Sequence, residues 1–281
     1  MIRMDPLVST RWLAEHADTV RIVDASYYLP EHARHARAEF VAGHIPGAVF
    51  LDLATLVDAG SSLPMTLPPA SDIADRLGLL GIATGEPIVL YDASPLHSAA
   101  RAWWMLRLVG IEQVSILDGG FAAWRAEGRA TIGDDVIHSP ARHELAAPLS
   151  TVNGFEAMRD LVATGRDQIV DARSPARFAG SEPETRPGLA SGHIPGSRNL
   201  HYATLFDADG LWKPCDALAR AFADAGVDLD RPTIATCGSG VTAAVLVFAA
   251  HLLGKPMGLY DGSWSEWGAH PDTTKATGPV A

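Results

Sequence analysis

The sequence contains one five-residue stretch twice, as Gly43-His44-Ile45-Pro46-Gly47 and as Gly192-His193-Ile194-Pro195-Gly196. The similarity continues on both sides of the stretch, pairing Ile22–Ala25 with Ile169–Ala172, Leu51–Leu56 with Leu200–Leu205, and Asp118–Trp124 with Asp261–Trp267. These landmarks keep their order and a nearly constant offset, which chance similarity explains poorly. The chain is therefore predicted to hold two copies of one domain.

Each copy alternates short β-branched stretches with helical patterns. The β-branched stretches predict buried strands at 20–24, 88–91, 114–117, 168–171 and 233–236. The patterns between them predict helices at 71–80, 99–109, 153–163, 217–225 and 241–253. This alternation predicts an α/β fold in which each copy is a mostly parallel sheet with helices on both faces. We expect domains at 1–130 and 151–281, joined by a polar linker at 131–150.

The composition indicates a globular protein with a hydrophobic core, since 47% of the 281 residues are apolar and 20% are charged. The formal net charge of −11 argues against binding of nucleic acid or anionic membranes, because both require a basic surface. An anionic substrate would need a local positive site. The longest apolar run, Val241–Leu253, is shorter than the roughly 18 residues of a membrane span. Met1–Pro6 lacks the pattern of a signal peptide, so we expect no membrane association.

The two cysteines of the sequence, Cys215 and Cys237, are too few for a disulfide framework. Free thiols suit a reducing compartment, and we expect a cytoplasmic location. Cys215 lies outside any loop signature and is interpreted as a bystander thiol, with redox regulation as the alternative. His32 and His35 have helical spacing but no third ligand, so no metal or other cofactor is expected.

The segment Thr233–Thr242 predicts a reactive cysteine. It runs from a buried strand through Cys237 and two glycines directly into an apolar helix. Sites in open α/β sheets form at this end of the strands. The glycines allow a tight turn with inward-pointing amides, and the helix N-terminus adds its positive dipole end, so the thiolate form is favoured. Ser239 and Thr242 could donate hydrogen bonds to a sulfur on that thiolate. The alternative is an inert buried cysteine.

The loop Cys237–Thr242 resembles the active-site loop of the 3-mercaptopyruvate sulfurtransferases, which belong to the tandem-domain rhodanese superfamily. The resemblance includes both Gly-His-Ile-Pro-Gly turns and Tyr260–Trp264, and it covers nearly the whole chain. In the related thiosulfate sulfurtransferases the loop reads Cys-Arg-Lys-Gly-Val-Thr. Gly238 and Ser239 replace its two cationic residues here, which favours mercaptopyruvate as the donor. The resemblance also implies a catalytically silent first domain, which has Tyr91–Ser94 where the loop cysteine would fall.

The resemblance implies that Arg177 and Arg186 bind the substrate's carboxylate and keto oxygen. A guanidinium suits this role because it grips a carboxylate through two hydrogen bonds and stays charged. Both arginines lie in the stretch Arg177–Gly188, which is rich in proline and glycine and is expected to form a loop. Two ordinary surface arginines are the alternative.

The resemblance further implies a relay of serine, histidine and aspartate, in which Ser239 and His44 match the first two members. No aspartate stands where the third is expected, so Glu31 or Glu39 would have to substitute, or the relay is incomplete. His193 occupies the same turn in the second copy. His44 could therefore equally be a structural turn residue.

The implied reaction moves a sulfane sulfur from 3-mercaptopyruvate to a thiol or cyanide through a persulfide on Cys237, releasing pyruvate. The persulfide would be held by Gly238, Gly240, Val241 and Thr242, and the acceptor would be a small thiol or a thioredoxin-like protein. Three alternatives remain: a thiosulfate:cyanide sulfurtransferase, a non-enzymatic persulfide carrier, and a cysteine phosphatase. The phosphatase is disfavoured because no arginine closes the loop, which continues as Val241-Thr242-Ala243.

Overall fold

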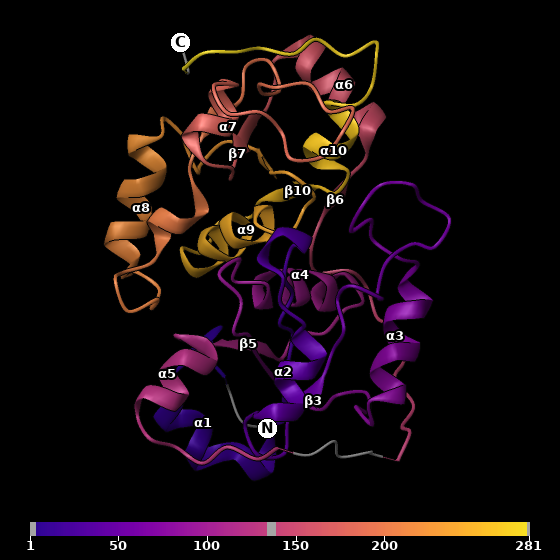
Figure 1. The fold of residues 1–281 in the computed structure, drawn as a ribbon, viewed down its shortest axis with the longest axis vertical. Helices are drawn as coiled ribbons and strands as arrows, with labels where there is room; N and C mark the ends of the chain where they lie inside the picture. The colour runs from indigo at the N-terminus through magenta and orange to yellow at the C-terminus, as the bar shows by residue number, and fades with distance from the viewer. Residues whose placement is uncertain (1–3, 134–138, 280–281) are drawn as a thin grey trace. The chain divides into compact units, whose positions relative to one another are not determined.

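The computed structural model describes residues 4–133 and 139–279, which divide into two compact units. The first unit is built from Met1–Asp58, Leu67–Ser150 and Ala208–Trp212, and the second from Ala59–Thr66, Thr151–Asp207 and Lys213–Ala281. In Figure 1 most of the first unit is indigo to magenta, and the later elements of the second unit are orange to yellow.

The first unit contains a five-stranded parallel sheet. Its strands are β1 (Leu7–Val8), β2 (Arg21–Asp24), β3 (Val49–Phe50), β4 (Ile88–Tyr91) and β5 (Val114–Leu117), in the spatial order β1-β5-β4-β2-β3. Its helices are α1 (Thr10–His16), α2 (Ala36–Ala42), α3 (Ala70–Leu79), α4 (Ala99–Leu108) and α5 (Gly120–Ala126), with 3-10 turns η1 (Ala17–Thr19) and η2 (Pro30–His32). Strand β4 is buried along its whole length, as its continuous apolar sequence requires. Strand β5 is buried as well, and the hydroxyl of its Ser115 donates to the carbonyl of Asp5 (2.6 Å).

The second unit repeats this plan element by element. Its strands are β6 (Val152–Asn153), β7 (Gln168–Asp171), β8 (Arg198–Asn199), β9 (Thr233–Thr236) and β10 (Gly258–Tyr260), in the order β6-β10-β9-β7-β8, and all pairs are parallel. Its helices are α6 (Phe155–Thr164), α7 (Pro175–Ala179), α8 (Cys215–Asp224), α9 (Ala243–Leu252) and α10 (Ser263–Trp267), with the 3-10 turn η3 (Tyr202–Leu205). The predicted pair of α/β domains is confirmed.

Helix α9 is an almost entirely buried helix. Its residues from Ala243 to Ala250 are all buried, so the helix has no polar face. It packs on β9 and β10, directly after the strand that ends at Thr236. The apolar run Val241–Leu253 is therefore a core helix, as the sequence indicates. Within the described ranges, every helix is too short or too polar to cross a membrane.

The described part of the expected linker runs along the first unit. Backbone hydrogen bonds join the amide of Ala141 to the carbonyl of Gly78 (2.9 Å) and the amide of Leu149 to the carbonyl of Arg107 (2.8 Å). The residues 134–138 of this linker lie outside the described ranges. The proposed boundaries at 131 and 150 stay a prediction.

Candidate functional site

Cys237 lies immediately after β9, at the carboxyl end of the sheet of the second unit. Its side chain is only 2% exposed within the structure. The backbone of Cys237 is fixed by two hydrogen bonds from α10: its amide donates to Ser263 Oγ (3.2 Å), and its carbonyl accepts from the amide of Trp264 (3.0 Å). The residue is therefore held in place by both the strand that it follows and a neighbouring helix.

The loop after Cys237 presents its amides without acceptors. Among the described residues, the N–H groups of Gly238, Ser239, Val241 and Thr242 have no hydrogen-bond acceptor. Gly240 has φ of +79°, a left-handed conformation that few side chains tolerate and that turns the chain back into α9. Unsatisfied amides at the start of a buried helix form an anion-binding site, because both their partial charges and the helix dipole favour a negative group.

Arg177 lies directly against this loop. A Cβ atom on Gly238 would stand only 3.4 Å from Arg177 Nη2, so a larger side chain at 238 would have to displace the guanidinium. Arg177 Nη2 donates to Glu184 Oε2 (2.5 Å), whereas its buried Nε has no hydrogen-bond partner among the described residues. The guanidinium is thus anchored by one edge and retains a donor for a ligand.

The stretch Arg177–Gly188 was expected to be a loop throughout, but its first residues, Arg177–Ala179, are helical. Arg177 belongs to the short helix α7, whose N-cap Ser174 accepts the amide of Arg177 (3.4 Å) and whose first position is Pro175. Serine followed by proline is a helix-start signal. It outweighs the nearby glycines, and the irregular part begins only at Gly180, which ends the helix at φ +74°.

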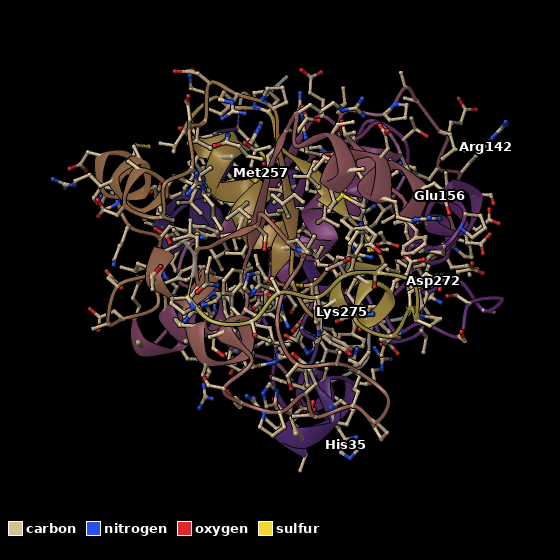
Figure 2. All side chains as sticks on the ribbon, turned by 90° about the horizontal axis from the view of Figure 1, so that it is seen from above. His35, Arg142, Glu156, Met257, Asp272 and Lys275 are labelled. Atoms are coloured by element: carbon tan, nitrogen blue, oxygen red, sulfur yellow. The ribbon has the colours of Figure 1, made fainter. Side chains whose placement is uncertain are left out.

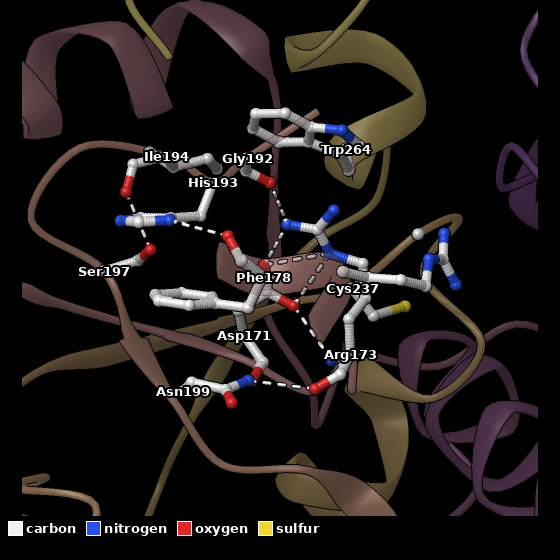
Figure 3. Close-up of polar contacts among 12 residues, drawn as sticks. Asp171, Arg173, Phe178, Gly192, His193, Ile194, Ser197, Asn199, Cys237 and Trp264 are labelled. Carbon is white, nitrogen blue, oxygen red and sulfur yellow. Dashed lines mark hydrogen bonds and ion pairs between the residues drawn. The ribbon is translucent and has the colours of Figure 1, made fainter. Parts of the chain in front are cut away.

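A buried ion-pair network around Arg173 reaches Arg177 through Glu184. Figure 3 shows the part of it that joins Arg173 to Asp171 and Gly192. Arg173 donates from Nη2 to Asp171 (2.6 Å) and to the carbonyl of Gly192 (2.8 Å), and from Nη1 to Glu184 (2.7 Å). Its guanidinium lies 4.6 Å from the centroid of the Trp264 ring. Burial acts to lower the pKa of Arg173, but the two carboxylates outweigh it and raise that pKa above its ordinary value.

Glu184 is the residue that joins this network to Arg177. Its carboxylate is 1% exposed and accepts from both Arg173 and Arg177. Sequence reasoning missed Arg173 and Glu184, although an arginine two residues after the Asp171 that ends a strand was an available signal. Trp264, over which Arg173 lies, is a core residue at 1% exposure, and its indole donates to the carbonyl of Ala190 (2.9 Å).

Arg186 reaches the loop through Ser265. Arg186 Nη1 donates to Ser265 Oγ (2.7 Å), and Ser265 donates from both Oγ (2.6 Å) and its amide (2.9 Å) to the carbonyl of Gly238. The structure therefore gathers both predicted substrate arginines around Gly238. Ser265 was not singled out from the sequence, where only its membership of the repeated Asp261–Trp267 stretch marked it.

The two loop residues with hydroxyl groups, Ser239 and Thr242, are both buried, at 6% and 9% exposure. Thr242 stands at the N-cap position of α9. Their predicted hydrogen bonds to a bound sulfur stay a prediction.

His44 has the same surroundings in the first unit as His193 has in the second. His44 stacks on Phe40 (ring centroids 3.9 Å apart) and its Nδ1 contacts the Phe40 carbonyl at 2.7 Å. His193 stacks on Phe178 (3.8 Å) with its Nδ1 at 2.8 Å from the Phe178 carbonyl. A shared packing motif in both copies, one of which has no thiol loop, supports the structural alternative. A catalytic role for His44 stays a prediction.

The two acids considered for the relay differ in their engagement. Glu39 receives hydrogen bonds from Arg34 (2.8 and 2.5 Å) and from the Tyr28 hydroxyl (2.9 Å), and the Arg34 bonds lower the pKa of Glu39. Glu31 lies exposed in η2. Glu39 is thus already neutralised by an arginine.

The first unit fills the equivalent loop with its own carboxylate. Asp92 follows β4 as Cys237 follows β9, and it accepts the amides of Ser94 (2.9 Å) and Ala99 (2.7 Å) at the start of α4. Burial raises the pKa of Asp92 to about 7. The first copy therefore satisfies internally the kind of amides that the second copy leaves open.

The other candidates lie apart from this loop. Cys215 is exposed at the start of α8. His35 points outward from the ribbon at the start of α2 (Figure 2). No cluster of three or more His, Cys, Asp or Glu side chains suited to a metal occurs within residues 4–133 and 139–279.

Comparisons with known proteins identify the family of this chain. A family model of the rhodanese-like domain matches residues 9–127 and 155–270. The 3-mercaptopyruvate sulfurtransferase of Rattus norvegicus is 41% identical over 270 residues, covering 93% of this chain and 91% of the rat protein. The thiosulfate sulfurtransferase of Cricetulus griseus is 40% identical over 284 residues, covering 97% and 95%. The crystal structure of SseA from Escherichia coli, described among 3-mercaptopyruvate sulfotransferases, superposes with a TM-score of 0.84 at 38% identity, covering 93% and 99%.

Proposed function

This chain belongs to the rhodanese family and is a sulfurtransferase, and we propose that it takes sulfur from 3-mercaptopyruvate onto Cys237 and passes it to a thiol. The observation that carries the proposal is the ring of acceptor-free amides after Cys237, in a loop whose side chains add no charge. Such a ring stabilises a thiolate and then the persulfide formed from it. Arg177 and Arg186, both gathered at Gly238, supply the donors for the substrate.

The first half-reaction is a transfer to a thiolate. Arg186 binds the substrate carboxylate and Arg177 its carbonyl oxygen. The Cys237 thiolate attacks the mercapto sulfur, an S–S bond forms, and the carbon–sulfur bond breaks. The electron pair of the carbon–sulfur bond stays on the carbon fragment, which leaves as the enolate of pyruvate. The guanidinium of Arg177 stabilises this enolate. The enolate then takes up the proton of the former mercapto group and becomes pyruvate.

The second half-reaction restores the enzyme. The thiolate of an acceptor attacks the outer sulfur of the persulfide, the S–S bond to Cys237 breaks, and the Cys237 thiolate leaves. Each half-reaction requires one substrate and releases one product before the next begins, so the kinetics are ping-pong. The acceptor that we propose is a small thiol or a thioredoxin-like protein, in the reducing cytoplasm that the two unpaired cysteines suit.

The charge balance near the loop supports mercaptopyruvate as donor. Arg173 and Arg177 are neutralised by Asp171 and Glu184, which leaves the charge of Arg186. One positive charge matches the single carboxylate of mercaptopyruvate, whereas thiosulfate carries two negative charges. The thiosulfate alternative has its own support, because a relative named for thiosulfate is 40% identical.

Comparing kcat/KM for the two donors tests the proposal, with the Cys237→Ser variant as the blank. We expect a clear preference for 3-mercaptopyruvate and no turnover of either donor by the variant. A preference for thiosulfate would transfer the assignment to the alternative. Persulfide formation without release of pyruvate would contradict an enzyme and indicate a carrier.

A further inference from the structure

The first unit contains a pocket that sulfur transfer does not use. The pocket has a volume of about 400 Å³ and includes Asp24, Ser26, Gly43 and Phe121 in its lining, with Arg34 and Arg125. All of its lining residues belong to the first unit, and they surround the carboxyl ends of β2 and β4. The kind of ligand that suits this pocket can be inferred from the equivalent position in the second unit.

Sheet register and hydrogen bonds make the two places equivalent. Asp24 is opposite the last residue of β4, as Asp171 is opposite the last residue of β9. The amide of Phe121 donates to the carbonyl of Asp92 (2.9 Å), as the amide of Trp264 donates to that of Cys237 (3.0 Å). Phe121 is therefore the counterpart of Trp264.

Two further members of the lining, Ser26 and Gly43, have counterparts as well. The amide of Ser26 donates to Asp24 (2.8 Å), as the amide of Arg173 donates to Asp171 (2.9 Å). Gly43 precedes one stacked histidine and Gly192 precedes the other. The small side chain of Ser26 thus stands where the second unit has an arginine.

In the second unit, the guanidinium of Arg173 fills this place (Figure 3). It donates to the Asp171 carboxylate and the Gly192 carbonyl, and it lies over the Trp264 ring. In the first unit the three equivalent groups are present: the Asp24 carboxylate, the Gly43 backbone and an aromatic ring at Phe121. The difference is that no arginine pairs with the Asp24 carboxylate among the described residues, while the guanidinium of Arg125 lies over Phe121 at 5.9 Å from the ring centroid.

The Asp24 carboxylate is the group most affected. It is buried, and the loss of hydration raises its pKa, as expected for an acid without the arginine that its counterpart has. Arg34 does not replace that arginine, since it forms a bidentate pair with Glu39 and stacks 4.0 Å over Tyr28. Arg125 is an exposed residue of α5 whose guanidinium lies over the Phe121 ring, and among the described residues it forms no ion pair with Asp24. The Asp24 carboxylate is accordingly an acidic group that neither arginine of the lining neutralises.

We propose that this pocket binds a small molecule with a guanidinium group, held by the Asp24 carboxylate, the Gly43 carbonyl and the face of Phe121. A planar cation forms charge-assisted hydrogen bonds with the carboxylate and stacks on an aromatic ring. The free volume beyond one guanidinium accommodates an alkyl chain. The site is separate from the Cys237 loop and independent of the donor preference proposed above.

Isothermal titration of the full chain with N-ethylguanidine tests this site. N-ethylurea has the same shape without the charge, and ethylamine has the charge without the planar fork, so both serve as control ligands. We expect saturable binding of N-ethylguanidine that is at least about tenfold tighter than that of either control, the value of one charge-assisted hydrogen bond.

Two variants locate the binding. Asp24→Asn removes the counter-charge and should weaken binding by about tenfold or more. Ser26→Arg supplies a tethered guanidinium, as Arg173 does, and should abolish binding while raising Tm. Retained circular dichroism and sulfur transfer show that each variant is folded, and Asp24→Asn alone suffices if Ser26→Arg does not fold.

Three results would overturn the proposal. The first is no saturable binding of N-ethylguanidine by the folded parent chain. The second is binding that Asp24→Asn leaves unchanged. The third is a site for anions, seen as sulfate binding that is lost in Arg125→Gln, whereas a guanidinium site should bind equally well or more tightly in that variant.

Discussion

Replacing Glu184 by glutamine should weaken both the fold and the binding of substrate. The Glu184 carboxylate is 1% exposed and carries two ion pairs, with Arg173 at 2.7 Å and Arg177 at 2.5 Å. Removing one partner of a buried pair costs about 3–5 kcal/mol, and because a glutamine oxygen still accepts one hydrogen bond we expect a loss near the lower limit, roughly 3 kcal/mol. Arg177 then loses its anchor beside Gly238, and KM should rise by about tenfold, which corresponds to roughly 1.4 kcal/mol.

Urea denaturation and steady-state kinetics with 3-mercaptopyruvate measure these two effects. Glu182→Gln is the matched control, since it makes the same change two residues earlier at an exposed position and should leave both quantities unaltered. The reasoning is refuted if Glu184→Gln unfolds at the urea concentration of the parent and retains its KM.

Three further predictions concern the loop, the second arginine and the silent copy. Gly238→Arg places a second cation near Arg177, since an added Cβ at this position would stand 3.4 Å from Arg177 Nη2. The ratio of kcat/KM for thiosulfate to kcat/KM for mercaptopyruvate should therefore rise by about tenfold. An unchanged ratio in a two-donor assay would contradict this prediction. Arg186→Gln should raise KM for mercaptopyruvate by about ten- to a hundredfold with little change in Tm, and a fall in kcat alone would speak against carboxylate binding. Burial raises the pKa of Asp92 to about 7, so the folded chain keeps a proton that the unfolded chain releases near 3.8. The protonated Asp92 therefore adds to the free energy of unfolding. This stabilisation is complete below the pKa of the unfolded chain and is lost as pH rises toward 7, by at most about 4 kcal/mol. Asp92→Asn should flatten this fall in urea denaturation from pH 4 to 8, and an equally steep fall in the variant would show that another group causes it.

The long central elements were predictable because each has a local signal. Strands β4 and β9 are continuous apolar or β-branched runs between turn residues, and α9 is apolar around its whole circumference. The two-residue strands β3 and β8 escaped prediction, since two residues show no periodicity and their pairing depends on β2 and β7, which lie far away in sequence.

The candidate site was only partly visible for a similar reason. A strand, a cysteine, two glycines and a helix are contiguous, so the Cys237 loop could be read directly. Glu184, by contrast, acquires its meaning from Arg173 and Arg177, eleven and seven residues away, through contacts that no spacing rule describes. The repeat aligns Ser26 with Arg173, since each directly follows the matched stretches Ile22–Ala25 and Ile169–Ala172. What stayed hidden is the set of contacts that Arg173 makes with Asp171 and Glu184.

The central claim is that the loop amides hold a sulfur atom on Cys237, and mass spectrometry tests it most directly. The protein is treated with 3-mercaptopyruvate without an acceptor, then analysed intact and after digestion. We predict the added mass of one sulfur atom on the peptide of Cys237, removed by a reducing thiol, present in Cys215→Ser and absent in Cys237→Ser. An unmodified Cys237, or sulfur found on Cys215 instead, would contradict the account.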